Sequence, residues 1–477
     1  MTTIKQHIPT EFIQKFTSSQ AWEYLIVPYD MVNSVLLCYG QKDKQYDYIC
    51  QEIDVLYDIK IEITQIAEDE LQRLLSQYYR ADAREKRSAI SRSITEIGSG
   101  QGFLFGFIEE AFDNYASDIH IESYEERCRI RLRIDGKLIE KYIIEKMNYA
   151  SLINQIKILA NLDISERRLP QDGRILYNRN GKKFDVRVSS LPAIYGEKIV
   201  MRLLTRHIEL LELSNLGFSK RQLDDYYKVI EKPHGMILIC GPTGSGKSTT
   251  LYATLRRLNK ESGNILTIED PVEYTLTGVN QVQLKDEIGL TFASALRTFL
   301  RQDPDIIMLG EIRDTETAQM AIRSSLTGHL IFSTIHTNSA WGSVSRLIDM
   351  GVHPYLIANT LIMCVSQRLI RLLCPHCKQK KEIDEEDIKE LLFDKNIQYY
   401  YEAKGCNKCY YTGYSGRRAI YEVIPIDDEL AISVRNNESD VEQLLKTRGI
   451  ISLKDAGFKM LQNGETSIEE LIPLLRD

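Results

Sequence analysis

The sequence contains no long apolar segment. Its longest apolar runs, such as residues 236–240, are far shorter than the roughly 20 residues that a membrane-spanning helix needs. The first residues, MTTIKQHIPTEF, show no charged segment followed by an apolar stretch, so we expect no signal peptide. Any role at a membrane would therefore act through a partner protein.

The sequence also lacks an excess of basic residues. Its 60 Lys and Arg stand against 67 Asp and Glu, a net charge of -7, whereas a dedicated nucleic-acid binder is usually basic. The most basic stretch, RCRIRLR at 127–133, alternates polar and apolar residues and predicts a strand with a cationic face. That face would be solvated or would contact an acidic partner or neighbouring subunit, and we expect no direct binding of nucleic acid.

Low-complexity segments and internal repeats are absent as well. The chain is 43% hydrophobic and 27% charged, which indicates folded domains rather than disorder. At roughly 150 residues per domain, its length predicts about three domains. Its 9 cysteines are an odd number in a chain without an expected signal peptide, which argues against a disulfide framework.

Apolar periodicity and turn-forming residues divide the chain into six expected segments. They are a small N-terminal α/β domain that is a candidate docking module (1–90), a polar linker (91–102), an α+β domain (103–207), an α/β core (208–373), a cysteine-rich element (374–409) and a C-terminal helical part (410–477). In the first segment we expect strands at 23–27 and 34–39. Asp135 and Gly136 predict a hairpin turn in the third.

Short apolar runs alternate with helical stretches in the segment 208–373. The expected strands are 236–240, 265–268, 306–309 and 330–335. Strands that alternate with helices form a mostly parallel sheet covered on both faces. The predicted fold class is therefore α/β.

Residues 241–248 read GPTGSGKS and match the phosphate-loop pattern G-x-x-x-x-G-K-[ST] between a strand and a helix. Glycines in such a loop let backbone N–H groups face phosphate oxygens, and the helix N-terminus favours negative charge. Lys247 would reach the β- and γ-phosphates, and Ser248 would offer its hydroxyl to Mg²⁺. The predicted ATP-binding loop consists of Gly241, Pro242, Thr243, Gly244, Ser245, Gly246, Lys247, Ser248 and Thr249.

Two other expected strands end in carboxylates. Glu311 follows the third strand, where many P-loop enzymes carry Asp. Glu273 follows the second strand and is the candidate that polarises the attacking water. The neighbouring Glu269 and Asp270 would contribute to the site, or would act as a helix cap or ion-pair partner.

Two histidines, His329 and His336, stand at opposite ends of the fourth expected strand, so they would not touch the same atom. His336 lies at the carboxyl end, where ligands bind in parallel sheets. It would sense the γ-phosphate through a hydrogen bond, or would have a structural role.

Four cysteines form two C-x-x-C pairs, with 28 residues between the pairs. Four thiolates suit tetrahedral Zn²⁺, and such a closed set of ligands is typical of a structural site. The predicted zinc ligands are Cys374, Cys377, Cys406 and Cys409. The remaining cysteines are isolated and look like small core residues.

The chain from about residue 103 to its C-terminus resembles the secretion ATPase superfamily, in the branch of type IV pilus assembly and type II secretion ATPases. Besides the phosphate loop and the cysteine pairs, the motifs that carry the resemblance are ASDIHIE (116–122), RLPQDGR (168–174), TIEDPVEY (267–274), LRQDPDIIMLGEIRD (300–314) and TGHLIFSTIHTN (327–338). The resemblance implies a RecA-like P-loop ATPase domain preceded by a PAS-like domain.

The resemblance also implies roles for single residues. Lys247 would be the Walker A lysine, Glu273 the catalytic glutamate, Glu311 the Walker B glutamate and His336 the histidine of the His box. In this family, arginines of the preceding domain contact the nucleotide phosphates, and Arg187 and Arg202 match them best. The expected cofactors are ATP, Mg²⁺ and Zn²⁺.

The family forms hexameric rings on the cytoplasmic face of the inner membrane, where a platform protein inserts pilin subunits into a filament. The leading interpretation is therefore a filament-assembling ATPase of a type IV pilus, and the alternative is a type II secretion ATPase. Retraction and conjugative ATPases lack the four-cysteine element, so they are less favoured as interpretations of this chain.

The N-terminal segment is short and shows no RLG-type signature, so control by cyclic-di-GMP is not expected. A nucleotide-binding ring scaffold with little turnover is the alternative from another class.

Overall fold

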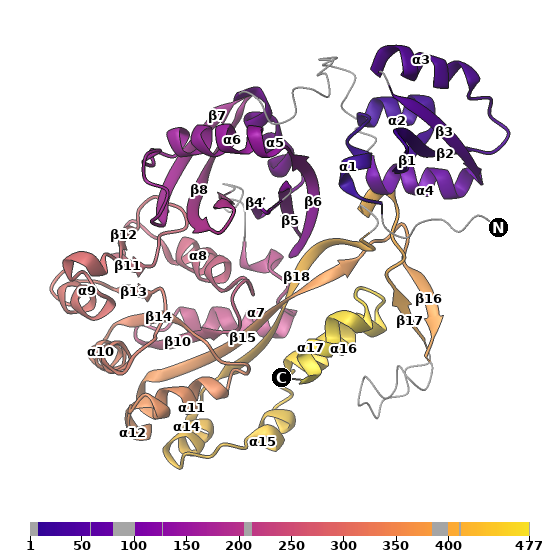
Figure 1. Cartoon of the computed structure of the whole chain (residues 1–477). Coiled ribbons are helices and arrows are strands. Elements are labelled where there is room, and N and C mark those ends of the chain that lie inside the picture. Colours follow the sequence, from indigo (N-terminus) through magenta and orange to yellow (C-terminus); the bar gives the residue numbers. More distant parts are fainter. Residues whose placement is uncertain are drawn as a thin grey trace. The chain divides into compact units, whose positions relative to one another are not determined.

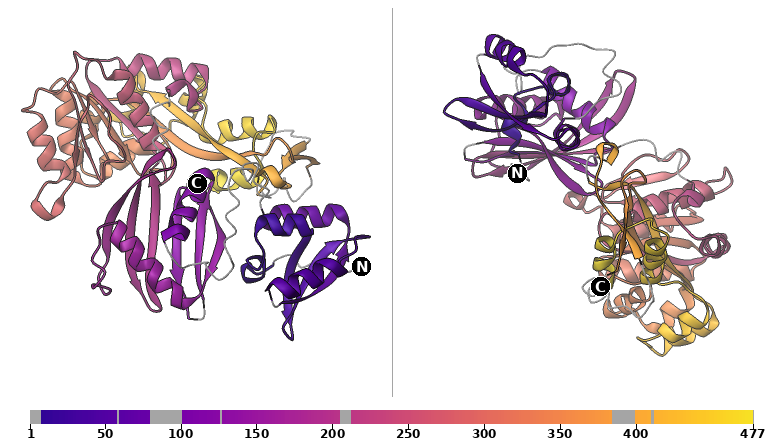
Figure 2. Two further views of the ribbon diagram at one scale, coloured as in Figure 1. Left: turned by 90° about the horizontal axis from the view of Figure 1, so that it is seen from above. Right: turned by 90° about the vertical axis from the view of Figure 1, so that its right-hand side faces the viewer.

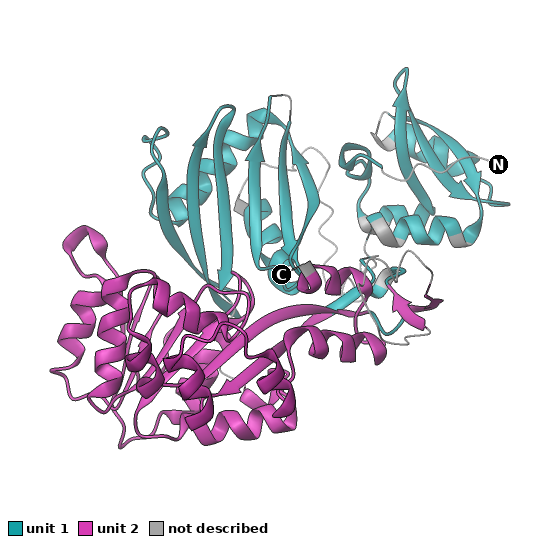
Figure 3. Ribbon diagram, turned by 90° about the horizontal axis from the view of Figure 1, so that it is seen from below, with its two compact units in different colours: residues 1–205, 374–378, 403–415 teal, residues 206–373, 379–402, 416–477 magenta. Residues whose placement is uncertain are grey.

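The computed structural model describes residues 8–57, 59–79, 101–125, 127–204, 212–383, 399–409 and 412–476. Most of the expected linker 91–102 lies outside the described residues. The chain forms two compact units (Figure 3): unit 1 contains residues 1–205, 374–378 and 403–415, and unit 2 contains residues 206–373, 379–402 and 416–477. Among the described helices, none combines the length and the apolar character needed to cross a bilayer.

The N-terminal part of unit 1 is a three-stranded sheet with four helices. Its elements are α1 (Thr10–Ile13), α2 (Ser18–Tyr24), β1 (Ile26–Val32), β2 (Val35–Gln41), α3 (Asp47–Tyr57), β3 (Lys60–Ile66) and α4 (Glu68–Tyr78). In the strand order β1-β2-β3, the first pair is antiparallel and the second parallel. Figures 1 and 2 show this sheet in indigo.

The expected strand at 23–27 begins later than predicted. Thr17 and Gln20 form a reciprocal capping box that starts α2. Leu25 adopts a left-handed conformation (φ 56°) and ends the helix, so the strand starts at Ile26. The capping box, which the apolar pattern does not reveal, therefore assigns Glu23 and Tyr24 to a helix.

The second part of unit 1 is a six-stranded sheet with two helices. Its elements are α5 (Gln101–Asp113), β4 (Asp118–Ser123), β5 (Cys128–Ile134), β6 (Lys137–Ile144), α6 (Lys146–Leu159), β7 (Gln171–Arg179), β8 (Lys182–Ala193) and β9 (Gly196–Leu204). The strand order is β6-β5-β4-β9-β8-β7, and every pair is antiparallel. Side chains of α5 and α6 share one apolar core with the sheet.

Strand β5 has the alternating burial that its sequence predicts, with its arginines on the more exposed face. Asp135 and Gly136 both have positive φ, 47° and 84°. They form the turn between β5 and β6, which confirms the predicted hairpin.

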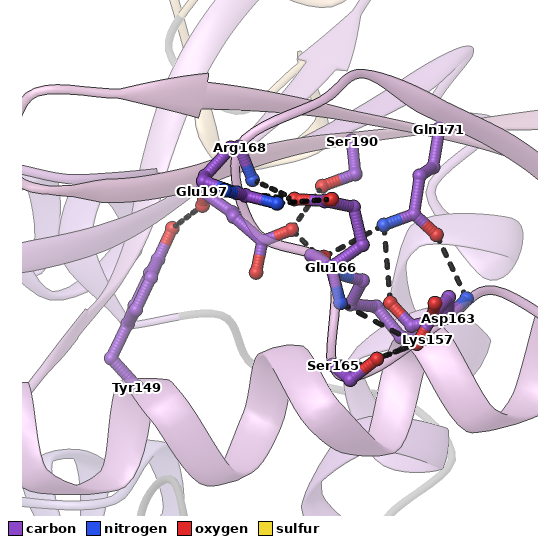
Figure 4. Close-up of polar contacts among 9 residues, drawn as sticks. All are labelled: Tyr149, Lys157, Asp163, Ser165, Glu166, Arg168, Gln171, Ser190 and Glu197. Carbon is purple, nitrogen blue, oxygen red and sulfur yellow. Dashed lines mark hydrogen bonds and ion pairs between the residues drawn. The ribbon is translucent and has the colours of Figure 1, made fainter.

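A buried ion pair joins helix α6 to strand β9 (Figure 4). The Lys157 side chain is fully buried, and its Nζ lies 2.6 Å from Glu197 Oε1 and 2.7 Å from the carbonyl oxygen of Glu166. Ser190 Oγ donates a further hydrogen bond to Glu197. Because a buried ammonium needs such partners, this pair fixes the loop that carries Glu166.

The core of unit 2 is a seven-stranded sheet covered on both faces. Its strands are β10 (Gly235–Cys240), β11 (Ile265–Glu269), β12 (Asn280–Gln283), β13 (Ile306–Leu309), β14 (Leu330–Ile335), β15 (Leu361–Leu373) and β18 (Tyr414–Pro425). The order is β12-β11-β13-β14-β10-β15-β18. The pairs from β12 to β15 are parallel, which confirms the predicted sheet.

Two apolar cores flank this sheet, because alternate residues of β10 face opposite sides. Met236 and Leu238 belong to one core, and Ile237 and Ile239 to the other. The helices in the described residues of unit 2 are α7 (Lys220–Ile230), α8 (Lys247–Leu258), α9 (Phe292–Phe299), α10 (Thr315–Leu326), α11 (Gly342–Asp349), α12 (Pro354–Thr360), α14 (Asp428–Arg435), α15 (Glu442–Thr447), α16 (Leu453–Gln462) and α17 (Ile468–Arg476). Strands β16 (Gln379–Glu382) and β17 (Tyr399–Glu402) form a small antiparallel ribbon, and β17 contacts α16. Strand β18, which the sequence pattern did not predict, falls within the expected helical part 410–477.

Candidate active site

The phosphate loop connects strand β10 to helix α8. Its three glycines, Gly241, Gly244 and Gly246, have φ values of 141°, 80° and 90°. A Cβ atom at Gly241 would lie 2.4 Å from the carbonyl oxygen of Gln367. The sequence therefore folds into this loop because glycine alone tolerates both the backbone angle and the close approach.

Lys247 begins helix α8 and folds back over the loop. Its Nζ donates to the carbonyl oxygens of Gly241 at 2.8 Å and of Pro242 at 3.1 Å. Burial lowers the pKa of the Lys247 ammonium, while the nearby Cys240 and Glu311 act in the opposite direction. Phosphate oxygens are the natural replacement for these carbonyl acceptors, since they carry charge.

Gln367 of strand β15 holds the loop from behind. Its amide Nε2 donates to the carbonyl oxygen of Ser245 at 2.8 Å, and its Oε1 accepts from Thr250 Oγ1 at 2.9 Å. The side chain is 2% exposed. Sequence analysis did not identify this residue, although a polar side chain inside a long apolar strand was a readable signal.

Glu311, Arg313 and His336 meet at the carboxyl ends of strands β13 and β14. The Glu311 carboxylate forms an ion pair with Arg313 and lies 3.3 Å from Nε2 of His336. Burial alone would raise the pKa of the Glu311 carboxyl, but the hydrogen bond and charge of Arg313, with His336, bring it below its ordinary value. Glu311 is therefore ionised at neutral pH, as a residue that holds Mg²⁺ or orients water must be.

Strand β11 brings a second acidic group to the same edge of the sheet. Asp270 lies 3.5 Å from the Arg313 guanidinium, which also pairs with Glu311. Glu269 is 4% exposed and accepts hydrogen bonds inside the protein. Glu273 follows on the loop, where its backbone N–H donates to the hydroxyl of Tyr252 at 3.2 Å. The geometry thus supports an ion-pair role for Asp270 and a buried structural role for Glu269.

The two arginines expected to contact phosphates, Arg187 and Arg202, belong to unit 1. They face each other in register on strands β8 and β9. The Arg202 Nε donates to the Asp118 carboxylate at 3.0 Å. Their contact with a nucleotide stays a prediction.

The four cysteines of the two C-x-x-C pairs form one cluster. Their sulfur atoms all lie within 4.8 Å of one another. The Sγ–Sγ distances are 3.8 Å for Cys374 and Cys406, 3.6 Å for Cys377 and Cys409, and 3.8 Å for Cys406 and Cys409. A tetrahedron of sulfurs around zinc with 2.3 Å bonds has edges of about 3.8 Å. The donor set and its spacing therefore fit Zn²⁺.

Comparison with known proteins places this geometry in a family. The profile of the family "Type II/IV secretion system protein" matches residues 101–473. The chain is 40% identical over 446 residues to the type II secretion system ATPase E of Vibrio cholerae serotype O1, covering 87% of this chain and 88% of that protein. It is 47% identical over 374 residues to the type IV pilus assembly ATPase PilB of Myxococcus xanthus, covering 76% of this chain and 65% of that protein.

A solved structure is similar in fold. The crystal structure of the pilus retraction motor PilT with bound ADP matches with a TM-score of 0.56 and 24% identity, covering 78% of this chain and 97% of that one. The fold and the site together define a P-loop ATPase of the RecA-like type. The chain belongs to the type II/IV secretion system protein family, which confirms the resemblance found in the sequence.

Proposed function

We propose that this chain hydrolyses ATP with Mg²⁺ and uses the energy to assemble a type IV pilus or a pilus-like filament. The observation that carries the proposal is the meeting of a phosphate loop with Glu311 and His336 at the ends of adjacent parallel strands. The effect of the Glu311 charge on the pKa of Lys247 supports a common site for both residues. Ligands bind at this edge of parallel sheets.

In this proposal the residues around the loop share the work of phosphoryl transfer. Lys247 binds the β- and γ-phosphates, and the Ser248 hydroxyl binds Mg²⁺. Glu273 orients the attacking water, and Glu311 with His336 responds to the γ-phosphate. Each role uses a side chain or a backbone group at the carboxyl edge of the sheet.

We further propose that the protein works as a homo-hexamer at the cytoplasmic face of the inner membrane, together with a membrane platform protein. Arg187 and Arg202 would contribute positive charge to the phosphates in the assembled ring. Zn²⁺, when bound, supplies a structural cross-link between the two cysteine pairs. The names of the relatives support a role in a secretion system or in pilus assembly.

Type II secretion is the second candidate, and one observation favours it. The match to the secretion ATPase E of Vibrio cholerae covers 87% of this chain, whereas the match to PilB of Myxococcus xanthus covers 76%. The longer match extends into the N-terminal part of the chain. A Lys247→Ala strain that loses surface pili supports the pilus function, and one that loses protein export supports secretion.

The test is Mg²⁺-dependent ATP hydrolysis by the purified full-length protein, with size analysis of every sample. Glu273→Gln and Lys247→Ala should each abolish turnover while leaving the assembly intact. Glu261→Gln is the matched control, because this carboxylate is exposed in the turn after α8. A folded, zinc-loaded wild-type protein that does not hydrolyse ATP, even with the platform protein present, would instead identify a nucleotide-binding scaffold.

A further inference from the structure

A buried carboxylate stands directly behind the loop that carries Glu273. Glu269 ends strand β11 and is 4% exposed. Three side chains donate hydrogen bonds to its carboxylate: Thr267 Oγ1 at 2.6 Å, Gln281 Nε2 at 3.0 Å and the hydroxyl of Tyr252. Since both carboxylate oxygens accept from buried protein donors, Glu269 serves as a fixed acceptor rather than as a group that reacts.

The Tyr252 hydroxyl joins this buried carboxylate to the loop that carries Glu273. It donates to Glu269 and accepts the backbone N–H of Glu273 at 3.2 Å. Burial, together with the charge of Glu269, raises the pKa of the Tyr252 phenol above its ordinary value, so the hydroxyl keeps its proton at neutral pH. The hydroxyl oxygen thus donates its hydrogen to the Glu269 carboxylate and accepts the Glu273 N–H with a lone pair.

The Tyr252 ring is held in place by its surroundings. The side chain is 2% exposed, and its ring packs edge-on against Tyr274, with 4.3 Å between the ring centres. Gln281 reinforces the same loop, because its Nε2 also donates to the carbonyl oxygen of Tyr274 at 3.1 Å. The hydroxyl therefore occupies a defined position.

We propose that Tyr252 is a positioning residue for Glu273 and that it couples the loop of Glu273 to the helix that starts at the phosphate site. The inference rests on the proposed ATPase function. Tyr252 lies on α8, five residues after Lys247. When the N-terminal end of α8 moves, Tyr252 thus moves the backbone of Glu273. The Glu273 carboxylate, which orients the water, moves with that backbone.

The test compares two buried tyrosines: Tyr252 on α8, and Tyr226, whose hydroxyl contacts α8 at Thr254. Tyr252→Phe keeps the ring and removes the hydroxyl that binds Glu273. Tyr226→Phe is the matched control, because Tyr226 is fully buried and its hydroxyl bonds only to Thr254 among the contacts described, at 2.8 Å and away from Glu273. The measurements are kcat and KM for Mg²⁺–ATP, and the hydrogen exchange rate of the Glu273 amide.

We expect Tyr252→Phe to lower kcat by roughly 10- to 100-fold with little change in KM, because a misplaced reacting group costs rate rather than binding. Exchange at the Glu273 amide should become faster, and Tyr226→Phe should behave as wild type. Glu269→Gln, which keeps the shape and removes the charge, should give an intermediate loss of kcat.

Wild-type kcat and wild-type amide protection in Tyr252→Phe would overturn the positioning role, while the ATPase function would stand if Glu273→Gln is inactive. Equal losses in both Phe variants with a lowered Tm would also overturn it, since a general packing defect would explain them. An inactive wild-type protein would contradict the proposed function instead, and the exchange of the Glu273 amide would then decide whether the Tyr252 contact exists.

Discussion

The Nε2 atom of His336 lies 3.3 Å from the carboxylate of Glu311. The two residues follow the parallel strands β14 and β13, which pair along the whole length of β13. Arg313 binds the same carboxylate and also approaches Asp270. Glu311 and Arg313 together thus link groups that follow three strands, and a γ-phosphate or its Mg²⁺ would compete for the same charges.

Glu311→Gln should lower ATP turnover by roughly 100-fold or more, because the carboxylate charge that binds metal or orients water is lost. His336→Gln should have a smaller effect, since it removes one partner of Glu311.

The pKa of Glu311 lies below its ordinary value. Glu311 therefore stays ionised at pH values where an ordinary carboxyl group is protonated. The wild-type ATPase rate should fall only when the pH drops through this lowered pKa and Glu311 becomes neutral. A pH–rate profile measures this, and such a fall in the rate already at neutral pH would contradict it.

Removal of metal from the cysteine cluster should unfold the cluster locally. Cys374→Ser or Cys409→Ser should abolish bound zinc, because three thiolates leave the tetrahedral site incomplete. Metal content per chain, measured together with the thermal unfolding temperature, tests this. Cys50→Ser changes a half-buried thiol outside the cluster and should keep the metal. If the wild-type protein contains no zinc and the cysteine variants unfold at the same temperature as the wild type, the four thiols of the cluster hold no metal.

Glu122 should stabilise unit 1 in a pH-dependent way. It accepts from Arg129 at 2.9 Å and Arg131 at 2.8 Å, and Lys198 lies 3.1 Å away. Burial would raise its pKa, but these three cations lower the pKa to about 2. A lowered carboxyl pKa gives stability that is present above the ordinary carboxyl value and is lost as the pH falls toward the lowered one.

At neutral pH, Glu122→Gln should therefore lower the free energy of opening of strand β4 by about 2 kcal/mol, since charged hydrogen bonds are lost. Native-state hydrogen exchange of β4 peptides measures this, and the difference from wild type should shrink as the pH falls below the ordinary carboxyl range. Glu145→Gln is the control, because Glu145 is exposed and makes no side-chain cap bond on α6. A difference that is independent of pH would contradict the electrostatic origin.

Four strands of the ATPase core, β10, β11, β13 and β14, could be predicted because each is a short, largely apolar run. Strand β14 is buried at every position, and its predicted bounds 330–335 agree with the structure. The cysteine cluster was equally readable, since the two C-x-x-C spacings already bring each pair of sulfurs together.

The partners of the site residues could not be predicted, because they lie far away in the sequence. Gln367 is 122 positions from Ser245, whose carbonyl it binds. Tyr252 occupies an ordinary helical position, and its bond to Glu269 depends on how α8 packs on β11. Strand β18 was missed because its first half, Tyr414 to Arg418, is polar and largely exposed.

Lys157→Met should destabilise the six-stranded part of unit 1 more than any exposed ion-pair variant. It leaves the buried Glu197 carboxylate without its cation, at a cost of about 3–5 kcal/mol. Lys157 also holds the carbonyl of Glu166, so the loop before β7 should open with it. The matched control is Lys446→Met, whose partner Glu442 lies on an exposed helix face, where solvent screens the pair and leaves it little stabilising effect.

Hydrogen exchange of the β8 and β9 peptides measures the effect within the full-length protein. The double variant Lys157→Met with Glu197→Met should recover much of the loss, because it removes both charges and fills the space with apolar groups. The recovery is what separates an unpaired buried charge from a simple packing defect, since a packing defect would grow with the second substitution. Equal exchange in the single and double variants would show that an unpaired buried charge is not the cause of the loss. Equal exchange in Lys157→Met and wild type would show that the pair does not stabilise this sheet.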